Sequence, residues 1–198
     1  MSDTIIFDTE QLAGIQPIYK PFDLVPENHS ILKQKAIPFD FDKENAADFS
    51  GRLRATIART RAFGVAAPQC NFPYRVFCMG AENEYVTLFN PEIISTSEET
   101  IILEEGCLSF PFLILNIIRP KEITIRFQDE KGETNTLTLA GLSARIALHE
   151  FDHLEGITFD TRAKPLALKN GFKKREKNTK KYARHLASQR KIQNEKPR

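Results

Sequence analysis

The chain of 198 residues is 41% hydrophobic and 27% charged, which suits one globular domain and excludes a fully disordered chain. It contains no run of 18 apolar residues and no basic start followed by an apolar stretch, so we expect neither a membrane span nor a secretory signal. The net charge is +2, and the odd number of cysteines, three, argues against a disulfide framework and favours the cytoplasm or an equivalent reducing compartment such as an organelle matrix.

The N-terminal residues 1–38 contain four prolines, which fix φ and remove backbone donors. They predict an extended, turn-rich arm packed on the domain. A helix is predicted next, over residues 44–61, capped by Asp42 and followed by Gly64. The apolar residues that share its predicted buried face, at steps of three and four, are Ala46, Phe49, Leu53 and Ile57.

Beyond residue 64 the hydrophobic period changes to two, which is typical of strands. We predict a break at Asn90-Pro91, a hairpin loop at residues 129–132, and a second helix over residues 142–154, after Gly141. Many short antiparallel strands around a few helices predict an α+β fold. The predicted strands span residues 74–79, 84–89, 92–96, 114–118, 122–128 and 133–139.

The last 30 residues form a basic tail, with 12 Lys or Arg and two Glu, whereas the other 168 residues carry 16 basic and 24 acidic side chains. Two interpretations are open: a solvated end without a partner, or an electrostatic handle for a polyanion. A helix is expected around Tyr182 and Leu186, which are four apart. We divide the chain into the arm (1–38), a catalytic domain (39–168) and the tail (169–198), and expect truncation after Lys169 to leave activity on a short peptide intact.

The strongest local pattern is His149-Glu150-Phe151-Asp152-His153, in the predicted second helix. Residues four apart lie on one helical face, so both imidazoles can point at one metal ion. Glu150 follows the first histidine and can reach a water on that metal as a general base. The alternative is a pair of helix-surface histidines without a metal.

Two histidines do not complete a catalytic metal site, which usually has three protein ligands and one water. A Cys, Asp or Glu can supply the third ligand. Cys107 lies in Glu105-Gly106-Cys107-Leu108-Ser109, a turn-like segment in which Gly106 permits close backbone approach. A lone cysteine is, however, most often a small buried hydrophobic residue.

A third pattern, Gly64-Val65-Ala66-Ala67-Pro68-Gln69, places small residues before a side-chain amide donor. Small residues permit close approach to a ligand or to other backbone. Taken alone, the segment is better explained as a tight connection between a helix and a strand.

Together, and in this order, the three patterns resemble the signature motifs of the peptide deformylase family: Gly-x-Gly-Leu-Ala-Ala-Pro-Gln, Glu-Gly-Cys-Leu-Ser and His-Glu-x-Asp-His. The second and third match fully, and the similarity spans residues 26–165. In the first, Ala62 and Val65 stand where the family usually has Gly and Leu, and Ala62 would be strained at a positive φ. Leu148 replaces a common Gln, and residues 110–115 are unusually apolar where many bacterial members carry polar or Arg residues.

The resemblance implies antiparallel strands around a central metal-binding helix, and a hydrolase that removes the formyl group from the N-terminal formylmethionine of nascent polypeptides. Cys107, His149 and His153 would bind one divalent metal, with Fe²⁺ expected as the native ion and Zn²⁺, Ni²⁺ or Co²⁺ accepted. Metal-bound water would attack the formyl carbon with Glu150 as general base. The Gln69 side chain and the Leu108 N–H would stabilise the oxyanion.

The resemblance also implies that the peptide lies extended against the Gly64 segment and the segment after Ser109, with its methionine side chain in an apolar pocket. The expected substrate-binding residues are Gly64, Phe63, Glu105, Gly106, Leu142 and Ile146. We further expect a monomer whose basic tail docks on the ribosome. The candidate docking residues are Lys173, Lys174, Arg175, Lys177, Lys180, Lys181 and Arg184.

Two other functions remain open on the sequence. Zinc peptidases also carry His-Glu-x-x-His, but their third ligand is usually a downstream carboxylate or histidine. The only downstream histidine here is His185, in the basic tail. The second alternative is a deformylase-like protein that binds metal or peptide without turnover.

Overall fold

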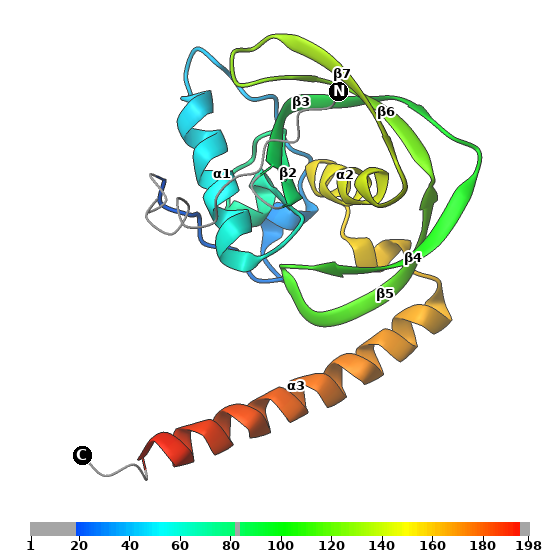
Figure 1. Cartoon of the computed structure of the whole chain (residues 1–198). Helices are drawn as coiled ribbons and strands as arrows, with labels where there is room; N and C mark the ends of the chain where they lie inside the picture. Colours follow the sequence, from blue (N-terminus) through cyan, green and yellow to red (C-terminus); the bar gives the residue numbers. More distant parts are fainter. Residues whose placement is uncertain (1–18, 82–83, 195–198) are drawn as a thin grey trace, which may run out of the picture.

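The computed structural model describes residues 19–81 and 84–194, with side chains described as far as residue 188. Within these ranges, five strands form one antiparallel sheet in the order β1-β2-β3-β6-β7, and β4 and β5 form a separate hairpin (Figure 1). The sheet consists of β1 Gly64–Ala66, β2 Val76–Ala81, β3 Glu84–Thr96, β6 Glu122–Gln128 and β7 Thr134–Ala140, and the hairpin of β4 Thr100–Cys107 and β5 Phe110–Pro120.

Helix α2 (Gly141–Leu154) lies at the centre, between the sheet and the hairpin (Figure 1). It can be buried there because its small and apolar residues pack against apolar side chains of β2, β3 and β6. Gly141, with φ of 58°, allows the chain to turn directly from β7 into the helix. The α+β prediction, with strands around a central helix, is therefore confirmed.

Helix α1 (Ala46–Thr60) covers the other part of the core and agrees with the predicted helix to within two residues. Its cap is Asn45, whose Oδ1 accepts the Asp48 N–H at 2.9 Å, so the prediction that Asp42 caps the helix is wrong. Asp42 instead lies in the preceding turn, where its N–H bonds to Asp40. Arg61 ends the helix with φ of 55°.

The predicted break at Asn90-Pro91 is also wrong, because β3 runs through both residues. The pairing of β3 with β6 shifts between Phe89 and Glu92, so Pro91 occupies an irregular position where its missing N–H does no harm. Asn90, with φ of 47°, uses its side chain to bond both Phe39 N–H (2.7 Å) and Phe39 C=O (3.1 Å). The irregularity thus ties the sheet to Phe39, directly after the N-terminal arm.

Strand β4 was not predicted, and the segment interpreted as a turn-like break at residues 105–109 is the end of this strand and its turn. The predicted strand at 114–118 is the middle of β5. The other predicted strands and the hairpin at 129–132 agree with β2, β6 and β7 to within two residues at each end.

Of the predicted N-terminal arm, residues 1–18 lie outside the described residues. Residues 19–38 are mainly extended and include a short 3-10 helix, Ser30–Lys33. The arm pairs with the end of α2, where the Ala36 N–H bonds to Leu154 O at 2.8 Å. Gly156, with φ of 70°, passes so close that a Cβ there would lie 2.8 Å from the carbonyl carbon of Lys33.

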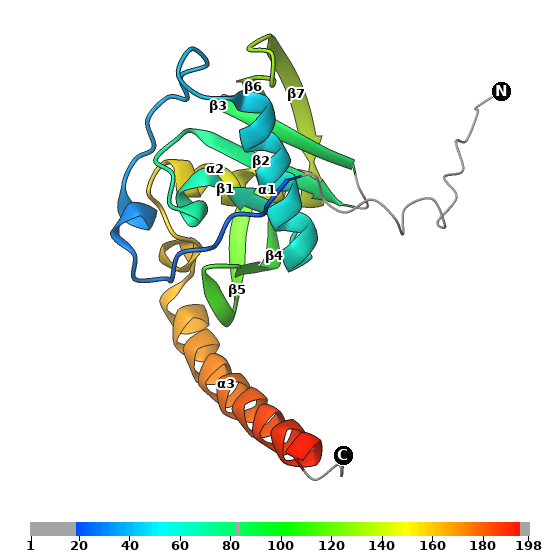
Figure 2. The ribbon, with the colours of Figure 1, turned by 90° about the vertical axis from the view of Figure 1, so that its left-hand side faces the viewer.

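The predicted tail helix is part of α3 (Pro165–Asn194), which at 30 residues is about 45 Å long. It starts beside β5 and extends away from the body (Figures 1 and 2). It begins before residue 169, where we placed a boundary, and that division stays a prediction. Among the helices of the described residues, none combines the length and apolar character needed to cross a bilayer.

Candidate active site

Three possible metal ligands from β4 and α2 lie together. The ligand atoms of Cys107, His149 and His153 are all within 4.8 Å of one another. Cys107 Sγ lies 3.3 Å from Nε2 of His153, and the two imidazole rings meet edge to face at 5.2 Å. The i, i+4 spacing on α2 therefore aims both rings at the cysteine that ends β4, as the sequence predicts.

The donor set fits a divalent transition metal, because one thiolate and two imidazoles leave a tetrahedral ion one open position. Burial, with the charges of His149 and Arg119, lowers the pKa of His153 well below its ordinary value and keeps the ring neutral, as a ligand must be. Burial also lowers the pKa of His149, but bonds with Cys107 and Glu105 outweigh it and raise that pKa to about 10. Cys107 and Glu105 thus favour positive charge at His149, next to the position where a metal cation would bind.

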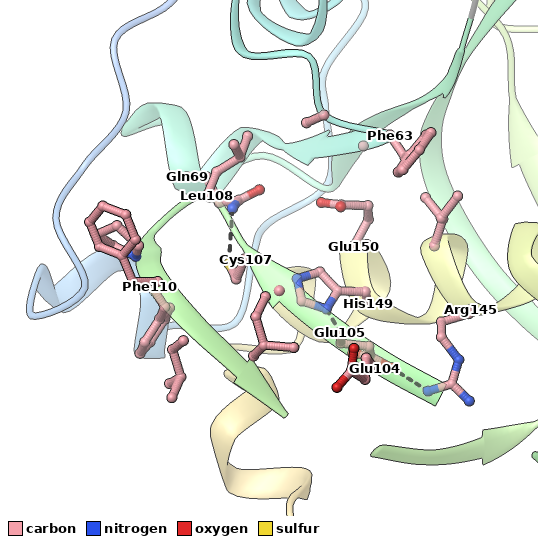
Figure 3. A pocket seen from close by; sticks show the side chains of 18 of the residues that line it. Phe63, Gln69, Glu104, Glu105, Cys107, Leu108, Phe110, Arg145, His149 and Glu150 are labelled. Carbon is pink, nitrogen blue, oxygen red and sulfur yellow. Dashed lines mark hydrogen bonds and ion pairs between the residues drawn. The ribbon is translucent and has the colours of Figure 1, made fainter. Parts of the chain in front are cut away.

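Glu150 projects from α2 toward the same space (Figure 3). Burial raises the pKa of its carboxyl to about 7, close to the value that suits a general base. Its Oε2 has no hydrogen-bond partner among the described residues. Gly64 of β1 makes room for it, because a Cβ at residue 64 would lie 2.6 Å from Glu150 Oε1.

Gln69 faces the site from the short 3-10 helix Ala67–Cys70 that follows β1. Its Oε1 accepts the Ala66 N–H at 2.9 Å, which orients the amide. Its Nε2 then points at Cys107 Sγ, 3.4 Å away (Figure 3), and lies at the same distance from Ser109 Oγ. Leu108 follows Cys107 in the turn, so its backbone is next to the same donor.

One cavity of about 520 Å³ unites these groups. Every predicted catalytic and substrate-binding residue lines it, together with the ligands Cys107 and His149; His153 lies behind Cys107. Ala62 and residues 110–114, which the sequence marks as departures from the family pattern, also line the cavity, and Glu104 and Arg145 are lining residues that the sequence did not indicate. The site is thus a concave, mainly apolar pocket with a few convergent polar groups.

The sequence profile described as polypeptide deformylase matches residues 21–169. The chain belongs to the peptide deformylase family. The peptide deformylase of Thermotoga petrophila is 38% identical over 135 residues, which are 68% of this chain and 82% of that protein.

Solved structures agree with the sequence match. The peptide deformylase of Thermotoga maritima superposes with a TM-score of 0.71 at 35% identity, covering 74% of this chain and 100% of that chain. A peptide deformylase of Synechococcus elongatus in complex with actinonin gives a TM-score of 0.74 at 28% identity, covering 80% and 90%. This chain is accordingly a deformylase enzyme that removes the N-terminal formyl group from nascent peptides, and the family implies one metal ion per chain.

Beneath the site, this peptide deformylase has a buried charge network that the sequence analysis missed. Glu105 Oε2 accepts from His149 Nδ1 at 2.9 Å, and its Oε1 is 2.6 Å from Arg119 Nε and 2.7 Å from Arg145 Nη1. Burial alone would raise the pKa of Glu105, but the bonds from Arg119 and His149 hold it at about 2. The carboxylate therefore fixes the orientation of the His149 ring.

The network continues below the helix. Arg119 Nη1 donates to Asp152 Oδ2 at 2.7 Å, and Asp152 Oδ1 accepts from Arg162 Nη2 at 2.6 Å. Asp152 belongs to the His-Glu-x-Asp-His motif, so the motif itself was a signal for this acceptor. No local pattern marks Arg119 or Arg162, which become partners only through the fold.

The departures within the first deformylase motif, Ala62 and Val65, cause no strain in the backbone. Ala62 is not among the non-glycine residues with positive φ in the described ranges, so the residue at this position need not be glycine.

The other two cysteines are core residues: burial raises the pKa of Cys70 to about 12 and that of Cys78 to about 11. Neither thiol is therefore reactive at neutral pH.

Proposed function

We propose that this deformylase uses one divalent metal, held by Cys107, His149 and His153, to hydrolyse the N-terminal formyl group of formylmethionyl peptides and release formate. Fe²⁺ is the proposed native ion, and Zn²⁺, Ni²⁺ or Co²⁺ would substitute for it. The ion, when bound, supplies Lewis acidity that lowers the pKa of water toward about 7. We further propose that the enzyme acts as a monomer in the cytoplasm or an organelle matrix.

The side chains of the pocket divide the remaining work. Glu150 accepts a proton from the attacking water and delivers it to the departing amine. Gln69 Nε2 and the Leu108 N–H donate hydrogen bonds to the oxyanion that forms from the formyl oxygen. Leu142, Ile146 and Phe63 receive the methionine side chain, while the β1 segment at Gly64 lies alongside the peptide like a neighbouring strand.

The observation that carries this proposal is the position of Glu150, buried beside the ligand group in the cavity that also receives Gln69 Nε2. The direct test is to incubate metal-replete protein with formyl-Met-Ala-Ser and measure formate and free amine. Release of both supports the deformylase. Cleavage of an internal peptide bond would instead indicate a peptidase, and no reaction a binding protein without turnover.

Two variants separate metal binding from catalysis. Cys107→Ala is expected to lose metal and activity together, because it removes the thiolate. Glu150→Gln is expected to retain metal but lose about 10²–10⁴-fold in rate, because the amide cannot accept a proton. Metal content after anaerobic purification identifies the native ion and provides the reference for both variants.

We also propose that α3 docks the enzyme on ribosomal RNA. Five exposed basic residues follow one another at steps of three and four, so they form one basic stripe along the helix. These residues are Lys169, Lys173, Lys177, Lys180 and Arg184. Arg175 is excluded from the stripe because it pairs with Glu27 of the arm at 2.5 Å. Tethering would raise the local enzyme concentration at emerging nascent chains.

The docking test neutralises four residues of the stripe, Lys173, Lys177, Lys180 and Arg184, by substitution with Gln. Co-sedimentation with ribosomes at low salt is expected to weaken markedly and to lose much of its salt dependence, because fewer counterions are released. Activity on formyl-Met-Ala-Ser serves as the internal reference. A matched control substitutes four exposed lysines of the body: Lys20, Lys33, Lys43 and Lys131. Equal sedimentation of both variants would contradict docking through the stripe.

A further inference from the structure

The hairpin of β4 and β5 forms one wall of the substrate pocket, here called the outer wall. Its strand pairing contains an irregularity. The pairing runs regularly to Gly106↔Ile114 and then jumps to Cys107↔Phe110, so residues 111–113 are extra on the β5 side. At the centre of this bulge, Phe112 has φ of 65°, which is uncommon for a bulky side chain. Such a conformation persists where surrounding contacts determine it.

Helix α3 contacts the Phe112 side chain. The ring of Phe112 lies 5.3 Å from the ring of Tyr182, a tilted aromatic pair between the pocket wall and the C-terminal helix. The helix approaches β5 closely at Gly171, which is buried and where a Cβ would overlap Leu115. The family profile ends at residue 169, so Tyr182 lies beyond the matched region.

The outer wall presents exposed apolar side chains to the cavity. Phe112 and Ile114 of β5 line the cavity and are each 40% exposed, whereas α2 supplies Leu142 and Ile146 to the same cavity. Arg145, the cationic residue of the lining, is buried and held by Glu105 and by the carbonyls of Ile117 and Ile101. Its charge therefore does not face the substrate, and the outer wall offers mainly apolar contact.

We propose that Tyr182 positions Phe112, which with Ile114 forms an apolar subsite for a side chain that follows the formylmethionine. This inference rests on the proposed function and specifies its substrates: formylmethionyl peptides with an apolar residue at the second or third position. Tyr182 is a positioning residue, and it gives α3 a role in substrate selection.

The test compares the specificity constants for formyl-Met-Ala-Ser, formyl-Met-Leu-Ser and formyl-Met-Ala-Leu. Wild-type enzyme is expected to prefer at least one leucine peptide. Tyr182→Ala is expected to reduce that preference by about three- to tenfold, in the lower part of the range for coupling between contacting residues, mainly through KM and with kcat retained. Tyr182→Phe keeps the ring and is expected to behave like wild type. Leu186→Ala, one turn further along α3, is the matched control and should retain the preference.

A double-mutant cycle identifies the route. In a Phe112→Ala background, Tyr182→Ala should have no further effect on the preference, because the residue through which it acts is gone. Additive effects, or a Tyr182→Ala variant that loses activity equally on all three peptides, would overturn the positioning role. Wild-type enzyme that cleaves all three peptides equally would refute the subsite alone. Wild-type enzyme that cleaves none would refute the proposed function and the subsite with it.

Discussion

At the scale of single residues, two glycines and one carboxylate set the geometry of the pocket. Gly64 and Gly106 both line the cavity, but what they approach differs. A Cβ at Gly64 would meet the carboxylate of Glu150, whereas at Gly106 it would meet Cδ1 at the end of the flexible Ile114 side chain, 2.9 Å away. Glycine is therefore required more strictly at residue 64 than at residue 106.

Gly64→Ala is expected to lower the specificity constant by about 10²-fold while metal content is retained, because a displacement of about 1 Å at a reacting group has that effect. Gly106→Ala should reduce it by less than tenfold, since Ile114 can rotate away. The measurements are steady-state kinetics on formyl-Met-Ala-Ser and metal analysis. If the two alanine variants are equally active, the close approach of Gly64 to Glu150 is not what requires glycine.

Glu105 is the residue at which the site and the fold depend on the same charge. Glu105→Gln leaves Arg119 and Arg145 with less compensation in a buried setting, so the free energy of unfolding should fall by about 3–5 kcal/mol. Loss of the His149 acceptor should weaken metal affinity about 10–100-fold. Urea denaturation and metal titration measure the two effects. Glu99→Gln, which removes the exposed pair with Lys121, is the control and should change neither quantity appreciably.

At the scale of elements, the C-terminal end of α2 joins the arm and the sheet. Glu155, which caps the helix, pairs with Lys35 of the arm at 2.9 Å and with Arg75, just before β2, at 2.6 Å. Burial raises the pKa of Glu155, but hydrogen bonds from Lys35 and Arg75 outweigh it and lower that pKa below its ordinary value. The ionised carboxylate therefore favours the folded state.

The sign of the pH dependence follows from that lowered pKa. The stabilisation by Glu155 is fully present above the ordinary pKa of a glutamate, about 4.3, and is lost as pH falls through the lower folded-state pKa. Glu155→Gln should therefore be less stable than wild type by about 1 kcal/mol at pH 7, and this difference should shrink as pH falls below about 4.3 and vanish once the carboxyl is protonated in the folded state. Urea denaturation at several pH values measures it. A stability difference that stays constant as pH is lowered would show that packing, and not the charge of Glu155, causes it.

The elements differ in how far they could be predicted from the sequence. Helices α1 and α2 were located because their apolar residues repeat at three and four, and the motif on α2 led directly to His149 and Glu150. Strand β4 was missed because its burial is inverted: Ile102 is 59% exposed and Glu105 only 6%. A buried carboxylate is stable there only because Arg119 and Arg145, which are distant in sequence, neutralise it. Partners of this kind have no local signature.

At the scale of the whole molecule, α3 contacts the body from its first turns as far as Tyr182, which lies against Phe112. Gly171 lies against Leu115 of β5, and Leu168 packs on the cluster that contains Phe159. Truncation after Lys169, which is predicted to leave activity on a short peptide intact, keeps Leu168 but removes Gly171 from its place against Leu115. The point at which the chain is shortened therefore decides whether the fold is affected.

Truncation after Lys164 is expected to lower the free energy of unfolding by about 2–3 kcal/mol, the scale of uncovering one large apolar side chain in the Leu113 and Leu115 region. Truncation after Ser188 keeps Gly171 and Tyr182 and should leave stability unchanged. Thermal and urea denaturation of the two shortened chains measure the contrast. Equal stability of both would show that α3 contributes little to the fold.

The pairing of the arm with α2 has a consequence for the order in which the chain acquires its structure during synthesis. Ala36 leaves the ribosome more than a hundred residues before Leu154, whose carbonyl it binds. At about 5–20 residues per second, that interval is roughly 6–24 seconds, during which the arm has no helix to pair with. Closing so long a loop is slow, so this contact belongs to a late stage of folding. Residues 19–38 are thus synthesised long before α2 but settle late, because their pairing with the catalytic helix can form only after that helix is present.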